Sequence, residues 1–240
     1  MRLPLVIFGI VHWSIFGIMV YLAAFVLEVS WTWILIGVAL YMVFFISCVI
    51  RILRHFYHFP IPSAMTKFID NPIRRKFFQQ PDRIAERMQL GPGMIVVEIG
   101  PGKGSYTKEV AKRVLPGGVV YAIDISENVI ARMKKMVNNE KISNIIPKID
   151  DAYGFSFIDE SVDRIFAVAC LPEIPDQVRV LKECRRILKH DGLISLCELL
   201  VDPDYPRRKT EMRWATEAGL ELKQAHGNWN AYQLNFGKKR

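Results

Sequence analysis

Charged residues are almost absent from the first fifty positions, where only Arg2 and Glu28 occur, and this absence restricts the possible folds more than any other feature. Two apolar runs, 3–27 and 31–50, fill the segment. Each is about as long as the roughly 20 residues that a helix needs to cross a bilayer core. The turn between them is short, so the pattern predicts two antiparallel transmembrane helices that form a hairpin.

The distribution of bases predicts the orientation of this hairpin. Bases follow the second apolar run and are absent from the turn: Arg51, Arg54, Arg74, Arg75 and Lys76. The positive-inside rule then places both termini and the rest of the chain in the cytoplasm, as a two-pass integral membrane protein. A cleaved signal peptide is the alternative for the first run. His12 could be functional within the membrane or simply a tolerated neutral side chain, and both interpretations stay open.

A stretch that mixes bases with aromatic side chains follows the hairpin, over 51–80. Such a mixture could bind nucleic acid, but directly after a membrane helix it is more typical of contact with anionic lipid headgroups. All of the net charge of +8 lies after residue 50. The predicted organisation is therefore a hairpin over 1–53, a basic and aromatic linker helix over 54–80, and a globular domain over 81–240.

The cysteines and histidines do not suggest a metal site or a disulfide framework. Cys48, Cys170, Cys184 and Cys197 show no C-x-x-C spacing, and Cys48 lies in an apolar run. This usage is typical of a reducing compartment with buried thiols. His55 and His58 have no third ligand nearby in the sequence, so we interpret them as interfacial side chains and expect no bound metal.

Strand-like and helix-like segments alternate along the globular domain. Apolar runs that predict strands occupy 94–99, 118–123, 145–149, 162–169 and 193–200, and a strand hairpin is expected over 220–226 and 231–236. Near-continuous apolar strands separated by helices indicate a parallel sheet covered on both faces. The predicted fold class is α/β: a Rossmann-like, mostly parallel sheet of seven strands that ends in an antiparallel hairpin. Ligands of such sheets bind at the carboxyl ends of the strands.

The loop after the first strand, EIGPGKGSYT over 98–107, carries the main functional signal. Its glycines allow a sharp turn and a close approach of the backbone to a ligand. The spacing G-x-G-x-G fits neither the dinucleotide fingerprint G-x-G-x-x-G nor the phosphate loop G-x-x-x-x-G-K-[ST]. The charge of Glu98 at the strand end would repel a pyrophosphate and suits a cationic ligand.

From about 81 to 236 the chain resembles the class I S-adenosylmethionine-dependent methyltransferases that act on small molecules. The segment 98–104 is similar to their cofactor loop, Asp124 to the acid that binds the ribose hydroxyls, and Asp151 to the acid near the adenine. The resemblance implies the following cofactor-binding residues: Glu98, Gly100, Pro101, Gly102, Gly104, Tyr106, Asp124, Ile125, Asp151, Ala152, Ala169 and Cys170. It also implies that S-adenosyl-L-methionine is the cofactor.

One departure from related families concerns nucleic acids. Enzymes that methylate amide or adenine nitrogens carry an Asn/Asp-Pro-Pro-Tyr-like tetrapeptide after the fourth strand, whereas this chain has CLPE over 170–173. We therefore expect no nucleic-acid partner, despite the basic charge.

The acceptor side of the site is less constrained by the sequence. Methyl transfer is an in-line displacement that mainly requires positioning, with a base only where the acceptor must lose a proton. The candidate catalytic residues are Glu173, Tyr205, His226 and Tyr232. Glu173 could equally be a helix-start carboxylate, and His226 could be a surface residue at a turn.

The sequence thus predicts a membrane-bound methyltransferase that acts on a lipid or another membrane-dissolved acceptor. A phospholipid amine headgroup ranks first, with a prenylated quinol or a lipophilic thiol close behind. A membrane-tethered module that binds S-adenosylmethionine without chemistry is the alternative from another class. A protein methyltransferase that acts on a membrane neighbour is a third possibility.

Overall fold

The computed structural model describes residues 3–26, 29–56 and 72–239. The chain divides into two compact units, Met1–Leu53 and Arg54–Arg240. Most of the predicted linker over 54–80 lies outside the described residues. The part that is described consists of the end of α2, the short helix α4 (Pro72–Phe77) and the residues that follow it.

Helical segments make up the described part of the first unit: α1 (Leu3–Tyr21), a π-helical turn (Leu22–Val26) and α2 (Trp31–Phe56). The rings of Phe16 and Tyr41 stack with their centroids 4.2 Å apart. His12 stacks on Phe45 and forms a hydrogen bond with the Tyr41 hydroxyl. The only titratable side chain in the middle of α1 therefore has a polar partner on α2.

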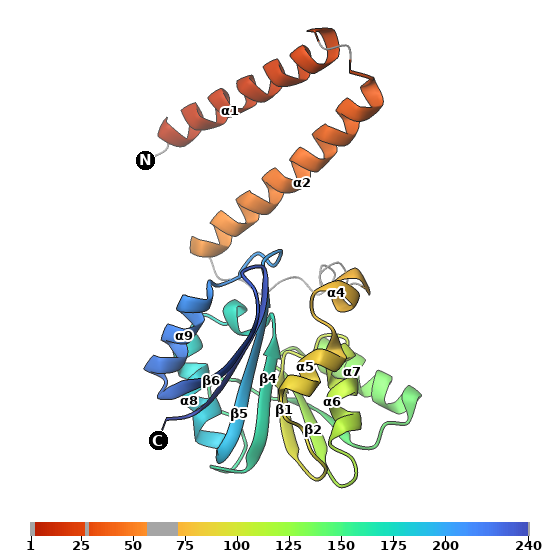
Figure 1. The fold of residues 1–240 in the computed structure, drawn as a ribbon, viewed down its shortest axis with the longest axis vertical. Helices are drawn as coiled ribbons and strands as arrows, with labels where there is room; N and C mark the ends of the chain where they lie inside the picture. Colours follow the sequence, from red (N-terminus) through yellow and green to blue (C-terminus); the bar gives the residue numbers. More distant parts are fainter. Residues whose placement is uncertain (1–2, 27–28, 57–71, 240) are drawn as a thin grey trace. The chain divides into compact units, whose positions relative to one another are not determined.

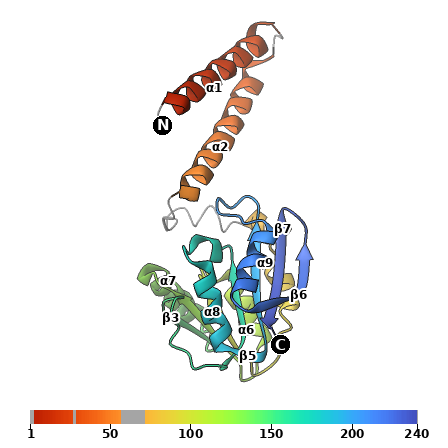
Figure 2. The ribbon, with the colours of Figure 1, turned by 90° about the vertical axis from the view of Figure 1, so that its left-hand side faces the viewer.

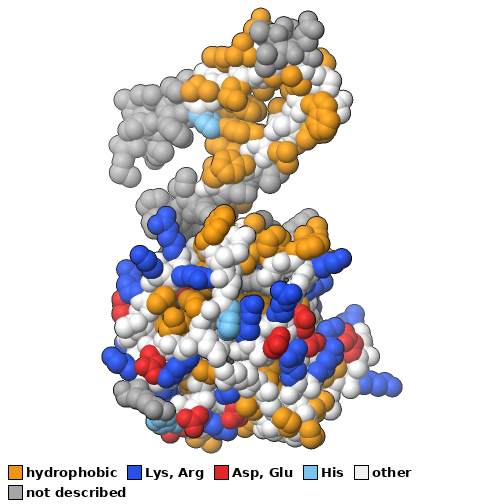
Figure 3. All heavy atoms as spheres, in the orientation of Figure 1, with side chains coloured by type: hydrophobic (Ala, Val, Ile, Leu, Met, Phe, Trp, Pro, Cys, Tyr) orange, Lys and Arg blue, Asp and Glu red, His pale blue; other side chains and the backbone are white. Residues whose placement is uncertain are grey.

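Apolar side chains dominate the exposed surface of α2. Residues Trp31–Ile50 have a mean hydropathy of 2.6, and only 6% of this segment is buried. In Figure 3 no Lys, Arg, Asp or Glu side chain is visible on the described atoms of α1 and α2. Within the part of the chain that the structure describes, the segment Trp31–Ile50 of α2 is the one helix long and apolar enough to cross a membrane. The apolar stretch His12–Ala24 is shorter.

A seven-stranded sheet forms the centre of the second unit (Figure 1). The strand order is β3-β2-β1-β4-β5-β7-β6, in which only the β5–β7 and β7–β6 pairs are antiparallel. The strands are β1 (Ile95–Ile99), β2 (Val119–Asp124), β3 (Ile145–Ile149), β4 (Val162–Val168), β5 (Leu188–Leu199), β6 (Leu220–Gly227) and β7 (Ala231–Lys238). The predicted sheet and its closing hairpin are confirmed.

Helices cover both faces of this sheet. One face carries α5 (Pro81–Arg87), α6 (Ser105–Arg113) and α7 (Glu127–Glu140). The other carries α8 (Gln177–Ile187) and α9 (Arg208–Glu217), which lie together in Figure 2. A 3₁₀ turn (Leu171–Glu173) precedes α8. Pro172 and Pro175 keep the two apart, because each lacks the N–H that a helix interior requires.

Buried apolar residues from both faces form the core. Phe166 of β4 and Ile194 of β5 are fully buried, as expected for central strands covered on both sides. Pro147 lies in β3, which is an edge strand of the sheet. A proline lacks a ladder donor and is tolerated at an edge, so the sequence expectation for this strand is confirmed.

Arg74 corrects one sequence interpretation. The charge pattern placed it among the bases that contact lipid headgroups, but it is only 6% exposed. Its two terminal nitrogens donate to the carboxylate of Asp202 at 2.7 and 2.8 Å, and its Nε donates to Oε1 of Gln79 at 2.7 Å. Arg75 also has a partner in the domain, because its Nη1 donates to the Ser105 hydroxyl at 2.9 Å. These two bases therefore connect α4 to the globular domain.

Candidate cofactor and acceptor site

The glycine loop that joins β1 to α6 lies between the ends of β1 and β4, where the strand order reverses direction. Gly100 has a φ of +70°, and a Cβ at this position would overlap Sγ of Cys170. Gly104, with a φ of +79°, directly precedes α6. Side chains at either position would be strained, so this loop requires glycine and brings its backbone close to the carboxyl edge of the sheet.

A cavity of about 540 Å³ opens at this edge. Its size lies in the range of small-molecule sites. The walls come from the ends of β1 and β2, the start of α7 and the segments that follow β3 and β4. Among the predicted cofactor residues, these line it: Gly100, Gly102, Asp124, Ile125, Asp151, Ala152 and Cys170. The sequence prediction therefore brought together residues that share one cavity.

The remaining predicted cofactor residues are outside this lining: Glu98, Pro101, Gly104, Tyr106 and Ala169. Glu98 is 1% exposed and accepts a hydrogen bond from the Thr107 hydroxyl, so its side chain connects β1 to α6. Tyr106 is buried in the core cluster on the α6 face of the sheet. These two side chains hold the loop and helix together.

Asp124 ends β2 at the wall of the cavity. Its Oδ1 accepts from the backbone N–H of Ser126 at 2.8 Å, which fixes the carboxylate. Burial raises the pKa of Asp124, and the hydrogen bond from Ser126 and the charge of Arg132 oppose that shift. A fixed carboxylate that faces a cavity is suited to accept hydrogen bonds from two neighbouring hydroxyls.

Asn128 and Arg132 also line the cavity, and the sequence analysis did not identify them. They lie one turn apart on α7, directly after Asp124. The sequence did contain a signal for these two residues. They are polar, are spaced i, i+4, and lie in the first turns of a helix that follows an acid at a strand end.

The segment after β4 forms the other end of the cavity. Ala169 has a φ of +50°, an uncommon value for a residue with a side chain, and its N–H donates to the carbonyl of Cys197 at 2.8 Å. Such strained backbone occurs preferentially at functional sites. Cys170 and Glu173 line the cavity here. Burial raises the pKa of the Cys170 thiol well above its usual range. The charges of four acids add to this shift: Glu173, Asp124, Glu198 and Glu98.

Of the four candidate catalytic residues, Glu173 alone lines this cavity in the described part of the chain. The Tyr205 hydroxyl donates to the carbonyl of Trp229, and the Tyr232 hydroxyl donates to the carbonyl of Pro206 at 2.9 Å. His226 lies near the end of β6, where burial and the charge of Arg87 lower its pKa. The hydroxyls of Tyr205 and Tyr232 are thus engaged in fixing the segments around β7.

A buried acidic cluster beside the cavity was also missed. Glu198 of β5 is 1% exposed and Glu211 of α9 is fully buried, and both face the α8–α9 side of the sheet. Burial and the charges of Glu211 and Asp202 raise the pKa of Glu198, while Arg74 opposes them. A glutamate in the otherwise apolar run over 193–200 was the available signal, because charged residues are rarely fully buried without a partner.

Glu211 should make the stability of the fold depend on pH. Burial raises its pKa from 4.5 to about 8. Between pH 4.5 and about pH 8, Glu211 keeps a proton in the folded chain that it has lost in the unfolded chain. The free energy of unfolding should therefore fall as pH rises through this range. Replacing Glu211 by Gln should reduce this slope, measured as urea midpoints between pH 5 and 9. Glu198 contributes with the same sign, so part of the slope remains.

The exposed Glu217, on the same helix, provides the matched control. Replacing Glu217 by Gln should leave the slope unchanged. An equal slope in wild type and in the Glu211→Gln protein would contradict the assignment.

Residues 97–196 match the family model described as a methyltransferase domain. The chain is 32% identical over 105 residues to phosphoethanolamine N-methyltransferase 2 of Caenorhabditis elegans, covering 44% of this chain and 24% of that protein. It is 32% identical over 124 residues to demethylmenaquinone methyltransferase of Staphylococcus carnosus, covering 52% of this chain and 50% of that protein. The chain spans about half or less of the length of these curated relatives.

A solved structure extends the similarity to the fold. The S-adenosylmethionine-dependent methyltransferase from Aquifex aeolicus superimposes with a TM-score of 0.68 at 21% identity, covering 74% of this chain and 98% of that one. With the domain match over 97–196, this identifies an S-adenosylmethionine-dependent methyltransferase domain of class I, with S-adenosylmethionine as its cofactor.

The residues of the cavity fit this cofactor. A glycine at position 100 avoids the Cβ that would collide with Cys170, and Asp124 offers carboxylate oxygens to the cavity. The apolar side chains of Ile99, Ile123 and Ile125 provide surface for a flat ring. The four carboxylates that line the cavity outnumber its single base, Arg132, and suit the positive sulfonium of the cofactor, which supplies the methyl group when bound.

Proposed function

We propose that this protein is an integral membrane methyltransferase whose acceptor is a lipid or another membrane-dissolved molecule, with a phospholipid amine headgroup ranked first. The observation that carries the choice of an amine is the set of four carboxylates that line the cavity, against the single base Arg132: Asp124, Asp150, Asp151 and Glu173. A protonated amine is stabilised by such surroundings, whereas an anionic acceptor would be repelled.

Glu173 is the residue that we assign to the acceptor. It lines the cavity beside Cys170, on the 3₁₀ turn after β4. An ammonium group must lose a proton before its nitrogen can attack a methyl group, and a carboxylate within hydrogen-bonding reach can accept that proton. Glu173 would hold the ammonium, orient it for in-line attack and receive the proton. The assignment of Tyr205, His226 and Tyr232 to catalysis has less support, because none of them lines the cavity.

Support for the membrane comes from the segment Trp31–Ile50, whose length and hydropathy are those of a spanning helix. We propose that α1 is a second span and that both termini and the domain over 81–240 are cytoplasmic. This arrangement rests on the bases that follow the second apolar run. An apolar acceptor would then stay concentrated near the enzyme without entering water.

A prenylated quinol remains the second candidate acceptor. Demethylmenaquinone methyltransferases occur among the curated relatives, beside the phosphoethanolamine enzyme. The demethylmenaquinone enzymes support a quinol acceptor here, and the phosphoethanolamine enzyme supports an amine acceptor. Each name describes the substrate of the relative.

Methyl transfer from labelled S-adenosylmethionine to a total membrane lipid extract tests the proposal. The full-length protein in detergent should label the organic-extractable fraction, and mass spectrometry should locate the added methyl group on an amine headgroup. Label on a quinol ring would favour the second candidate, and label confined to protein or RNA would exclude both. A scaffold that binds S-adenosylmethionine without chemistry would bind the cofactor in calorimetry and label no fraction of the extract.

A further inference from the structure

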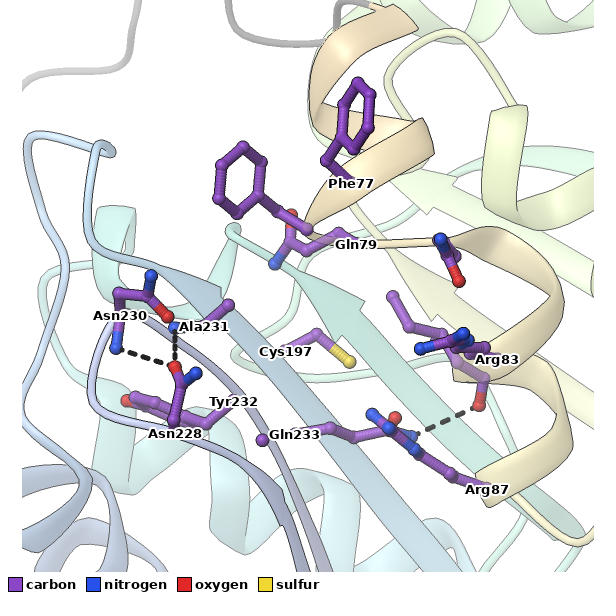
Figure 4. Close-up of a pocket in the computed structure, with 14 residues that line it drawn as sticks. Phe77, Gln79, Arg83, Arg87, Cys197, Asn228, Asn230, Ala231, Tyr232 and Gln233 are labelled. Carbon is purple, nitrogen blue, oxygen red and sulfur yellow. Dashed lines mark hydrogen bonds between the residues drawn. The ribbon is translucent and has the colours of Figure 1, made fainter.

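A second cavity, of about 290 Å³, lies on the α5 face of the sheet and shares no lining residue with the cofactor cavity. Figure 4 shows α5 on one side, the β6–β7 turn on the other, and Cys197 of β5 between them. Phe77 and Phe78, which end and follow α4, contribute to its rim and are 65% and 49% exposed. Nothing in the proposed methyl transfer uses this cavity.

Its charge is entirely positive. Arg83 and Arg87 are the charged residues that line it, and they lie one turn apart on α5. Neither guanidinium has an ion-pair partner among the described residues. Like charges at this spacing repel one another, so the pair is unfavourable unless an anion neutralises it. Burial raises the pKa of the Cys197 thiol on the floor of the cavity, and the charge of Arg87 opposes this shift. Burial and then the charge of Arg87 lower the pKa of His226.

Two buried polar atoms in the same lining lack a hydrogen-bond partner among the described residues: Nε2 of Gln79 and Oε1 of Gln233. The side chains are 3% and 1% exposed. Oε1 of Gln79 already accepts from Arg74, and Nε2 of Gln233 already donates to the Ser195 hydroxyl at 2.7 Å, so both amides are oriented. Buried polar atoms are seldom left unpaired in native proteins, and two in one cavity indicate a ligand.

The β6–β7 turn adds a rigid wall. Oδ1 of Asn228 accepts from the backbone N–H groups of Asn230 and Ala231 at 3.1 and 3.2 Å, as Figure 4 shows. The amide nitrogen of Asn228 is then left as a donor. The cavity thus combines two guanidinium groups, two oriented amide donors and one oriented acceptor.

We propose that this cavity binds a phosphate group together with a hydroxyl, carried either by the phosphorus of a free phosphate or by the alcohol of a headgroup. The phosphate oxygens would accept from Arg83, Arg87 and Nε2 of Gln79, and the hydroxyl would donate to Oε1 of Gln233. Guanidinium groups suit phosphate because their N–H groups match its oxygens in pairs. The site is independent of the methyl acceptor, and its ligand has two sources: a soluble phosphate or the headgroup of a membrane lipid. The exposed phenylalanines at the rim favour the headgroup.

Calorimetric titration of the full-length protein in maltoside detergent with inorganic phosphate tests the site. Phosphate should bind, and the double variant Arg83→Gln/Arg87→Gln should weaken it at least tenfold. Sulfate has the same shape and no hydroxyl at neutral pH, so it should bind more weakly than phosphate. Arg213→Gln, at an exposed arginine of α9, is the matched control and should bind phosphate as wild type does.

The affinity for S-adenosylmethionine should stay unchanged in the double variant, which also confirms that it is folded. Absence of phosphate binding, or equal binding by wild type and the double variant, would overturn the proposal. Protein in phosphatidylcholine nanodiscs, with and without phosphatidylglycerol, separates the two sources. Loss of phosphate binding when the anionic lipid is present supports the headgroup, and retained binding supports a soluble phosphate.

Discussion

Replacing Arg74 by Met should lower the free energy of unfolding by about 3 to 5 kcal/mol, the usual effect of removing one partner from a buried ion pair. Asp202 would keep a charge that is only 8% exposed, beside the buried Glu198 and Glu211. The variant also removes the donor to Gln79. Urea unfolding of the full-length protein, followed by circular dichroism, measures the change.

The double variant Arg74→Met/Asp202→Leu provides the internal comparison. It removes both charges, so it should recover much of the loss, because apolar replacements of a buried pair are often close to neutral. Lys76→Met, at an exposed base of the same helix, should change stability little. If Arg74→Met unfolds at the wild-type urea concentration, the ion pair does not connect α4 to the domain.

Replacing Asp124 by Ala should weaken S-adenosylmethionine binding by about 2 to 4 kcal/mol, the expected loss of charge-assisted hydrogen bonds from two hydroxyls. The carboxylate is held at the cavity wall by the N–H of Ser126. Calorimetry with the cofactor gives the change in affinity. Asp191→Ala is the control, since Asp191 is an exposed acid within β5 that does not line the cavity. Wild-type affinity in Asp124→Ala would refute the ribose assignment.

Local patterns predicted much of this molecule. The glycine loop 100–104, the acid at the end of β2 and the alternation of apolar strands with helices each lie within a short stretch of sequence. Backbone preferences and hydrophobic periodicity act over such stretches, so they could be interpreted without knowing the fold.

Arg74 shows where this approach fails. Its position after an apolar run suggested contact with lipid, but its partner Asp202 lies 128 positions further along the chain. No periodicity connects an arginine on α4 with an aspartate after β5. No sequence pattern indicates the cavity proposed to bind phosphate either. Its walls come from α5 and the β6–β7 turn, which are far apart in the chain.

Residue order alone therefore specified the strands, the cofactor loop and the apolar helices, because these depend on neighbours along the chain. Chain packing specified which charges are buried, which are paired and which face a cavity. Arg74 and Arg83 have ordinary sequence surroundings, and their environments arise from segments that folding brings together. The energy of a charge depends on the burial and the charges around it, so those two environments could be identified only in the folded protein.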